Sequence, residues 1–231
     1  MNVDMKKVIA FLRTLRENNN TEWFHAHRKE YEEAKDSFSQ FARRLIEETG
    51  RFDESVAGLE LKDCTYRINR DIRFSADKSP YKTHFGVFIA PGGKKSGRAG
   101  YYFHLSVGGD GYPDANMVAI GHYCYDKRVV EIVREDLMDE PEKFASFVRT
   151  GAKDGFTLDS EGSLKKLPKE FSECKYPDYA RLKVYCLSKF MSEEEVSDQE
   201  ELLQHVLTLF RRNKPFVEYL NQVIDYVSEE D

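Results

Sequence analysis

The stretch THFGVFIA, residues 83–90, opens the part of the chain that decides its fold. YYFHLSV, residues 101–107, and MVAIGHYC, residues 117–124, follow it across glycine-containing turns. Apolar side chains alternate in all three stretches, which predicts three β-strands. Because the links are short, neighbouring strands are expected to pair antiparallel. The longest link, residues 91–100, is glycine-rich and basic but lacks the GK[ST] ending of a phosphate-binding loop, so it is interpreted as a mobile hairpin tip.

Helical spacing of apolar residues precedes these strands. Residues 5–15 are expected to form an amphipathic helix that stops at the asparagine run 18–20. A second helix, capped by Asn20 or Thr21, is expected to continue to Gly50, because glycine suits the C-terminal stop of a helix. Both helices are interpreted as elements that cover the core.

Helical spacing returns after the strands. Asp126 is suited to cap a helix over residues 127–137, and another helix is expected over residues 141–148. Residues 182–190 alternate like one more strand. The sheet is therefore expected to gain a strand from a distant part of the chain.

The last part of the chain carries a further helical pattern. Ser197 and Glu200 have the spacing of a capping box ahead of it. Pro215 is expected to break or kink the pattern before a last helix that ends near Val227. Segregated helices and strands predict an α+β protein, with a central, mainly antiparallel sheet covered by N-terminal and C-terminal helices. No repeat or linker divides the chain, so a single domain over residues 1–231 is expected.

Composition limits the function. A net charge of −6 argues against a general nucleic-acid coat, which needs a broad surplus of Lys and Arg, but it leaves a local basic pocket open. The four cysteines are scattered without a CxxC pair, as reduced cytosolic thiols are. Neither a signal peptide nor a stretch of membrane-spanning length is recognised, so a cytoplasmic protein without membrane contact is expected.

The densest polar cluster is RINRDIRFSADKSPYKTH, residues 67–84. It holds five cations, two carboxylates, a tyrosine and a histidine. If residues 66–74 form a strand, alternation places Arg70 on a core face and four polar side chains on the other face: Arg67, Asn69, Asp71 and Arg73. An arginine on a core face needs a carboxylate partner, because a buried unpaired charge is costly.

Two interpretations of this segment stay open. In the first, the cations converge on one oxyanion, since guanidinium groups suit phosphate or carboxylate. The ligand-binding candidates in this segment are then Arg67, Arg70, Arg73, Lys78, Tyr81 and Lys82, and the candidates for proton transfer are Asp71, Asp77 and His84. In the second, the same charges form an ion-pair network that pins a loop to the helices.

Histidines are spread over the predicted strands at positions 84, 104 and 122. They lack the HxH or HExxH spacing of a metal site, so neither a metal nor a cofactor is expected. His84 is the preferred acid or base, because it ends the cationic segment and lies where a bound anion would be held.

The signature of one family, RxxRDxRFxx(D/N)KxxY, is matched at Arg67, Arg70, Asp71, Arg73, Phe74, Asp77, Lys78 and Tyr81. On these residues the chain resembles the DUF2461 family, whose function is unassigned. The resemblance extends over nearly the whole chain, including the Asn18-Asn19 pair, residues 101–105 and residues 214–216. It implies a bacterial protein of one domain, and it adds His104 as a second candidate histidine.

Two functional hypotheses follow from the segment. One is a small-anion site for phosphate or carboxylate, with phosphoester chemistry as the expected reaction class. The other is a non-catalytic module whose charges recognise an acidic protein segment or a nucleic-acid end, with residues 94–98 as an added contact. Oligomeric state is left open by both.

Overall fold

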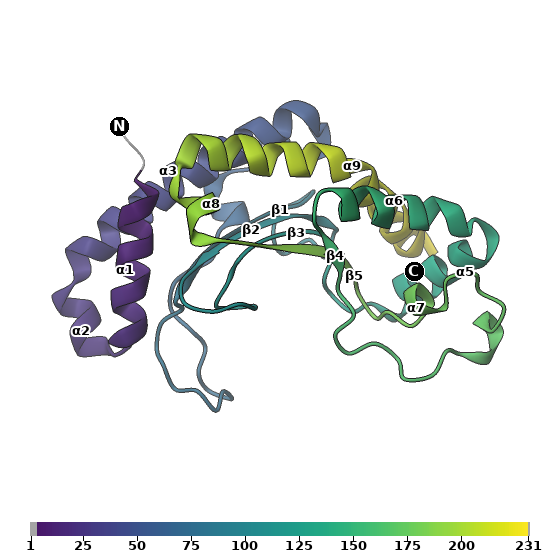
Figure 1. Ribbon diagram of the computed structural model, residues 1–231, viewed down its shortest axis with the longest axis horizontal. Coiled ribbons are helices and arrows are strands. Elements are labelled where there is room, and N and C mark those ends of the chain that lie inside the picture. Colours follow the sequence, from purple (N-terminus) through teal and green to yellow (C-terminus); the bar gives the residue numbers. More distant parts are fainter. Residues whose placement is uncertain (1–3, 231) are drawn as a thin grey trace.

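A computed structural model describes residues 4–230 of the chain (Figure 1). The strands are β1 (His84–Ile89), β2 (Gly100–Ser106), β3 (Asn116–His122), β4 (Thr157–Leu158) and β5 (Tyr185–Met191). The helices before and between them are α1 (Met5–Glu17), α2 (Thr21–Ala26), α3 (Arg28–Phe52), α4 (Leu61–Cys64), α5 (Lys127–Asp139), α6 (Pro141–Lys153) and α7 (Pro177–Ala180). The last two helices are α8 (Glu193–Ser197) and α9 (Gln199–Glu230).

The five strands form one sheet in the order β1-β2-β3-β5-β4, and every neighbouring pair is antiparallel. The two-residue strand β4 was not expected, whereas the other four lie within two or three residues of their predicted bounds. The α+β class with a central antiparallel sheet flanked by helices is therefore confirmed.

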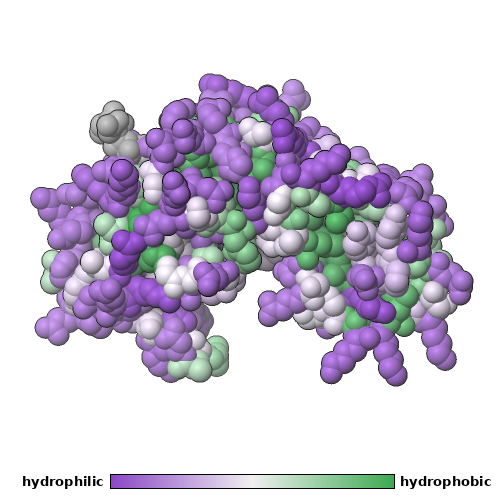
Figure 2. Space-filling view, in the orientation of Figure 1, coloured by the Kyte–Doolittle hydropathy of each residue, from purple (hydrophilic) through white to green (hydrophobic). Residues whose placement is uncertain are grey.

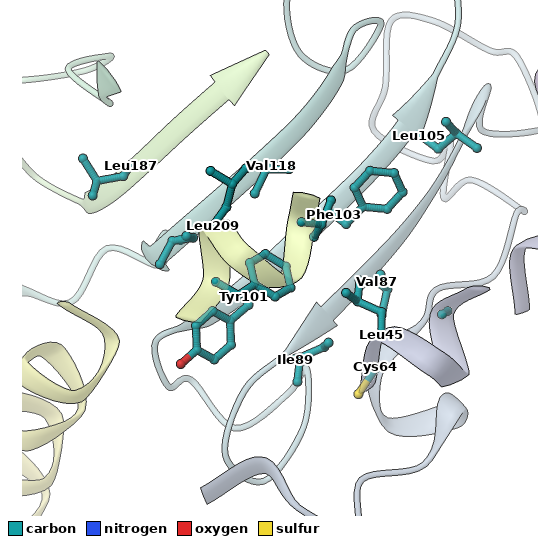
Figure 3. Packing of buried hydrophobic residues seen from close by; sticks show 14 of the residues in the cluster. Leu45, Cys64, Val87, Ile89, Tyr101, Phe103, Leu105, Val118, Leu187 and Leu209 are labelled. Carbon is teal, nitrogen blue, oxygen red and sulfur yellow. The ribbon is translucent and has the colours of Figure 1, made fainter. Parts of the chain in front are cut away.

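One face of the sheet builds the main core (Figure 3). Alternate strand residues point toward the long helices α3 and α9, which lie together on one side of the sheet in Figure 1. Val87, Phe103 and Val118 are fully buried there, and the ring of Phe103 lies 5.2 Å from that of Phe41 on α3. Full burial of such side chains is worth about 1.5–3 kcal/mol each, so this face fixes the strand register.

The strand residues that alternate with these core residues point to the opposite face of the sheet. His84 and Phe88 on β1, and Tyr102 and His104 on β2, share that face because side chains alternate along a strand. Phe88 is 4% exposed but does not belong to the main core cluster. Neither long helix reaches this second face in Figure 1. Phe88 and His104 are buried on it, whereas His84 and Tyr102 are partly exposed.

Several helix boundaries differ from those predicted. The second predicted helix is divided into α2 and α3 at His27, and Asn20 caps α2 through a bond from the Trp23 amide. Gly50 does not stop α3, which continues to Phe52. A Cβ at position 50 would lie 3.2 Å from the Cα of Ala57, so this glycine allows the next turn of chain to pack closely.

The C-terminal helix also differs. Ser192 and Glu195 form a capping box for α8, while the carboxylate of Asp198, not a Ser197 box, accepts the amides of the first turn of α9. Pro215 lies inside α9 without ending it. Both Pro215 and Arg211, whose carbonyl loses its helical donor, are exposed, so water can satisfy that carbonyl.

A glycine on β3 provides a test of the sheet. Gly121 has a φ of +133°, and a Cβ there would lie 2.3 Å from the carbonyl oxygen of Tyr185. We expect Gly121→Ala to lower the free energy of unfolding by about 2 kcal/mol, because the backbone must shift and the φ is unfavourable. Urea denaturation measures this. Gly162→Ala, at a φ of +70° with no atom within 4 Å, is the matched control and should cost less. Equal losses would contradict the close packing of β3 on β5.

Candidate functional site

The charged segment is an irregular hairpin rather than a strand. The amide of Arg70 donates to Pro80 O at 2.9 Å and that of Lys82 donates to Ile68 O at 2.8 Å. The strand expected over residues 66–74 is therefore wrong, because these backbone groups bond within the loop instead of to the sheet. Phe74, placed on the expected core face, is 96% exposed.

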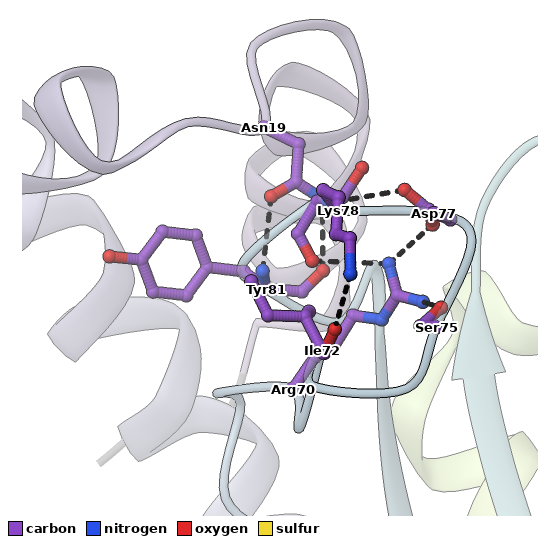
Figure 4. Close-up of polar contacts among 8 residues, drawn as sticks. Asn19, Arg70, Ile72, Ser75, Asp77, Lys78 and Tyr81 are labelled. Carbon is purple, nitrogen blue, oxygen red and sulfur yellow. Dashed lines mark hydrogen bonds and ion pairs between the residues drawn. The ribbon is translucent and has the colours of Figure 1, made fainter.

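Arg70 is the centre of the loop's internal bonding (Figure 4). Its guanidinium pairs with Asp77 and donates to Ser79 O at 3.1 Å and Ser75 Oγ at 3.4 Å. Hydrogen bonds from Ser79, followed by the Arg70 contact, lower the pKa of Asp77 to about 2. Lys78 Nζ donates to Ile72 O at 3.0 Å. These three charged side chains hold the hairpin together.

Tyr81 fastens the hairpin to the helices. Asn19 donates its amide to Tyr81 O at 2.9 Å and accepts the Tyr81 amide at 3.2 Å. The buried ring of Tyr81 stacks on Phe24 of α2, with centroids 3.9 Å apart. Tyr81, a residue of the family signature, therefore packs in the core.

Asp71 and Arg73 form a second pair, at the outer side of the loop. Arg73 Nε and Nη2 donate to the two carboxylate oxygens of Asp71 at 2.9 and 2.6 Å. The Arg73 hydrogen bonds lower the pKa of Asp71. The side chain of Arg73 is 76% exposed, so the pair extends into solvent. Such exposed pairs contribute little to stability.

Two cations of the segment have no carboxylate partner in the described part of the chain. Arg67 is exposed and makes no ion pair or side-chain hydrogen bond there. Lys82 is half-buried, with its Nζ 5.3 Å from the ring centroid of Tyr66. Burial, and then the charge of Arg67, lower the pKa of Lys82. The charge of Arg67 helps to lower the pKa of Asp71 without a close ion pair. Near the start of β1, Lys82 is thus a half-buried cation with Arg67 as its neighbour.

His84 and His104 lie near Lys82, on the face of the sheet away from α3 and α9. Their ring centroids are 4.4 Å apart. His104 Nε2 contacts Pro113 O at 2.9 Å, and its Nδ1 contacts the Tyr102 hydroxyl at 2.8 Å. Because a carbonyl only accepts, Nε2 carries the proton and Nδ1 accepts from Tyr102.

Both imidazoles are neutral at pH 7. Burial lowers the pKa of His104 to about 4. Burial, and then the neighbouring His104 and Lys82, lower the pKa of His84 to about 3. Each is a hydrogen-bonding group rather than a cation at that pH, and neither is tuned as a general base for neutral pH.

Sequence reasoning missed the aromatic side chains that surround these histidines. They are Tyr66, Phe88, Tyr102, Tyr112 and Tyr123. Tyr102 and Phe88 were visible in the alternation of their strands, as partners of His104 and His84 on one face. Tyr66 and Tyr112 lie in loops, where no periodicity signals the face they join.

Among residues 4–230, no group of three or more His, Cys, Asp or Glu side chains is arranged to hold a metal ion. Nor does any helix in this range have the length and apolar character needed to cross a bilayer.

The fold and site define an α+β protein whose antiparallel sheet carries helices on one face and a polar, aromatic cluster on the other. Residues 7–219 match the family model described as Conserved hypothetical protein (DUF2461). The chain belongs to this family, which confirms the resemblance carried by the signature. No curated protein and no solved structure matched the chain.

The two arginines of the signature provide a paired prediction. Arg70→Ala removes three side-chain contacts from the hairpin and is expected to lower the free energy of unfolding by about 1–2 kcal/mol. Arg73→Ala should change it by less than about 0.5 kcal/mol, because the pair it breaks is exposed. Urea denaturation of both variants checks this. A larger loss for Arg73→Ala would reverse the roles assigned to the two side chains.

Proposed function

We propose that the protein binds a small phosphate or carboxylate anion between Arg67 and Lys82, beside His84. The observation that carries this proposal is the half-buried ammonium group of Lys82, next to a second cation and without a carboxylate partner in the described residues. A charge withdrawn from water is costly unless it is paired. A bound anion offsets that cost.

The carboxylates of the segment support this assignment, because they are engaged elsewhere. Asp77 is held by Arg70 and Ser79, and Asp71 by Arg73. The ring of Tyr66 attracts the Lys82 ammonium through a cation–π contact worth about 0.5–2 kcal/mol, but a ring does not neutralise the charge.

The proposal gives different roles to the residues expected to bind the ligand. Arg67 and Lys82 contact the anion. Lys78 and Arg73 lie in the same loop but already bond to Ile72 O and Asp71. Arg70 and Tyr81 hold the loop that carries the site, while His104 holds Tyr102 and packs on His84.

Binding is better supported than proton transfer. A pKa of about 2 for Asp77 and of about 3 for His84 lies far below the neutral range that suits a general acid or base. His84 serves as a neutral hydrogen-bond donor to the anion. Phosphoester chemistry would require the bound anion to raise the pKa of His84, which an adjacent negative charge does.

A thermal-shift screen tests the proposal. Phosphate and small dicarboxylates are added to the wild-type chain, Arg67→Ala and Arg73→Ala at constant ionic strength. A ligand at about 100 times its Kd stabilises the folded state by about 2.7 kcal/mol, which raises Tm by roughly 5–10 °C for a chain of this size. The shift should be lost in Arg67→Ala and kept in Arg73→Ala. No shift with any anion in the wild type would refute the proposed site.

A further inference from the structure

Five aromatic side chains lie in one cluster, here called the aromatic face: Tyr66, Phe88, Tyr102, Tyr112 and Tyr123. Tyr66 and Tyr123 lie close enough to shift the pKa of each other's hydroxyl group. Tyr123 meets the ring of Phe88 edge to face at 5.4 Å, and Phe88 meets Tyr102 at 6.5 Å. Tyr112 lies 5.3 Å from the ring of His104, which bonds to Tyr102. Segments far apart in the sequence thus bring their rings together on one face of the sheet.

Much of the aromatic face is open to a ligand. Tyr112 is 62% exposed and Tyr123 is 52% exposed, whereas Phe88 beneath them is buried outside the main core. In Figure 2 the molecule is hollowed on the side of the sheet away from α3 and α9, the side to which these strand residues point. Aromatic rings that are neither in the core nor fully in water offer stacking surface.

The orientation of Tyr102 is fixed in advance. Its hydroxyl donates to His104, and its ring crosses Gly86 on the neighbouring strand. A Cβ at position 86 would lie 2.6 Å from that hydroxyl oxygen, so any larger residue at this position would displace the Tyr102 ring. A side chain that is already ordered loses little entropy when a ligand binds.

Cations border the aromatic face. Lys82 Nζ lies 5.3 Å, and Lys94 Nζ 5.9 Å, from the ring centroid of Tyr66. The ring of Tyr66 therefore lies against both cations, and its pKa is raised by burial and in part by Tyr123 and Tyr112, which places those tyrosines nearby. A ligand that fits both parts has a negative group at one end and a flat, apolar group at the other.

We infer that the anion bound by this protein carries a planar ring, as aryl phosphates and nucleoside monophosphates do. The inference rests on the proposed anion site and adds the class of ligand. The anionic group lies between Arg67 and Lys82, and the ring stacks on the aromatic face near Tyr112 and Tyr123. A purely aliphatic anion would use the cations but leave the stacking surface in water.

Isothermal titration calorimetry separates the two parts of the ligand. The wild-type chain is titrated with inorganic phosphate, cyclohexyl phosphate, phenyl phosphate and a nucleoside monophosphate. Cyclohexyl and phenyl phosphate have the same charge and similar size, but only the phenyl ring is planar. We expect phenyl phosphate to bind about tenfold more tightly than cyclohexyl phosphate, which corresponds to the lower part of the range for stacking on aromatic side chains. Tighter binding of the nucleoside monophosphate than of phenyl phosphate would identify a nucleotide as the source of the ring, and the reverse order an aryl phosphate.

Variants test where the ring lies. Tyr112→Ala and Tyr123→Ala should remove most of the preference for phenyl phosphate and leave the affinity for inorganic phosphate unchanged. Phe74→Ala is the control, because this ring is 96% exposed and lies outside the aromatic face, against Arg73 of its own loop. Far-UV circular dichroism and Tm verify that each variant folds.

Each outcome decides one of the two proposals. Equal affinities for phenyl and cyclohexyl phosphate, with inorganic phosphate still bound through Lys82, would overturn the ring inference and leave the anion site standing. A preference for phenyl phosphate that survives both tyrosine variants would also overturn it. If no phosphate compound binds, the anion site itself fails.

Discussion

Acidification from pH 6.5 to pH 4 is expected to lower the free energy of unfolding by about 3 kcal/mol through His104 alone. The imidazole is fully buried, and its pKa falls from 6.5 to about 4 because burial disfavours the charged form. Between these values the unfolded chain binds a proton that the folded chain does not, so stability falls as the pH falls. Above pH 6.5 the effect disappears. His84, whose pKa is lowered to about 3, acts in the same direction.

Urea denaturation at several pH values between 4 and 7 measures this loss. His104→Gln removes the titrating group and should reduce the slope of unfolding free energy against pH by up to about 1.4 kcal/mol per pH unit. His25→Gln, at an exposed position on α2, is the control and should keep the wild-type slope. An unchanged slope in His104→Gln would mean that His104 accepts a proton in the folded protein as readily as in the unfolded chain.

Lys82→Met is expected to weaken the binding of inorganic phosphate by roughly 10-fold to 100-fold. A hydrogen bond to a charged group is worth about 1.5–3 kcal/mol, and tenfold in affinity corresponds to about 1.4 kcal/mol. Methionine keeps an apolar stem of similar length but removes the half-buried charge. Because that charge has no carboxylate partner in the described residues, the variant should be as stable as the wild type or more stable.

Calorimetric titration with phosphate, together with urea denaturation, measures both properties of Lys82→Met. Arg73→Ala changes a cation of the same loop that already pairs with Asp71, so its affinity should stay within about threefold of the wild type. A loss of stability in Lys82→Met with unchanged affinity would make Lys82 a structural residue. An equal loss of affinity in both variants would point to the charge of the whole loop.

The sheet could be predicted from the sequence because its pattern is local. Tyr101, Phe103 and Leu105 alternate with polar or smaller partners, and each turn between strands carries glycine. Burial of one set of side chains fixes the register, so the pattern determines the pairing. The same alternation contains the second face, since Tyr102 and His104 lie between those core residues.

The charged hairpin could not be predicted in the same way. Alternation across residues 66–74 resembles a strand, but Arg70 bonds with Asp77, Ser79 and Pro80, which lie seven to ten residues further on. These contacts across the loop outweigh the local preference for a strand. Arg70 and Asp77 form an ion pair within the loop, as the second interpretation of the segment expects. The anion site of the first interpretation stays a proposal.

Two predicted helix ends were wrong for similar reasons. Pro215 removes a hydrogen bond on the exposed side of α9. The helix continues because the next residues, Phe216 and Val217, are buried in the core. Glycine is common at the C-terminal end of a helix, but Gly50 lies inside α3, where the absence of a side chain lets the following turn pack closely. In both cases tertiary contacts decide, and those contacts are absent from a local pattern.

The measurement that tests the anion site most directly is an NMR titration of the histidine ring signals with inorganic phosphate at pH 7. We predict that the His84 signals shift with saturation and that those of the exposed His25 do not. In Lys82→Met the same shift should need roughly 10-fold to 100-fold more phosphate. Saturable shifts confined to other histidines, or no change at His84 up to high phosphate, would contradict a site between Arg67 and Lys82.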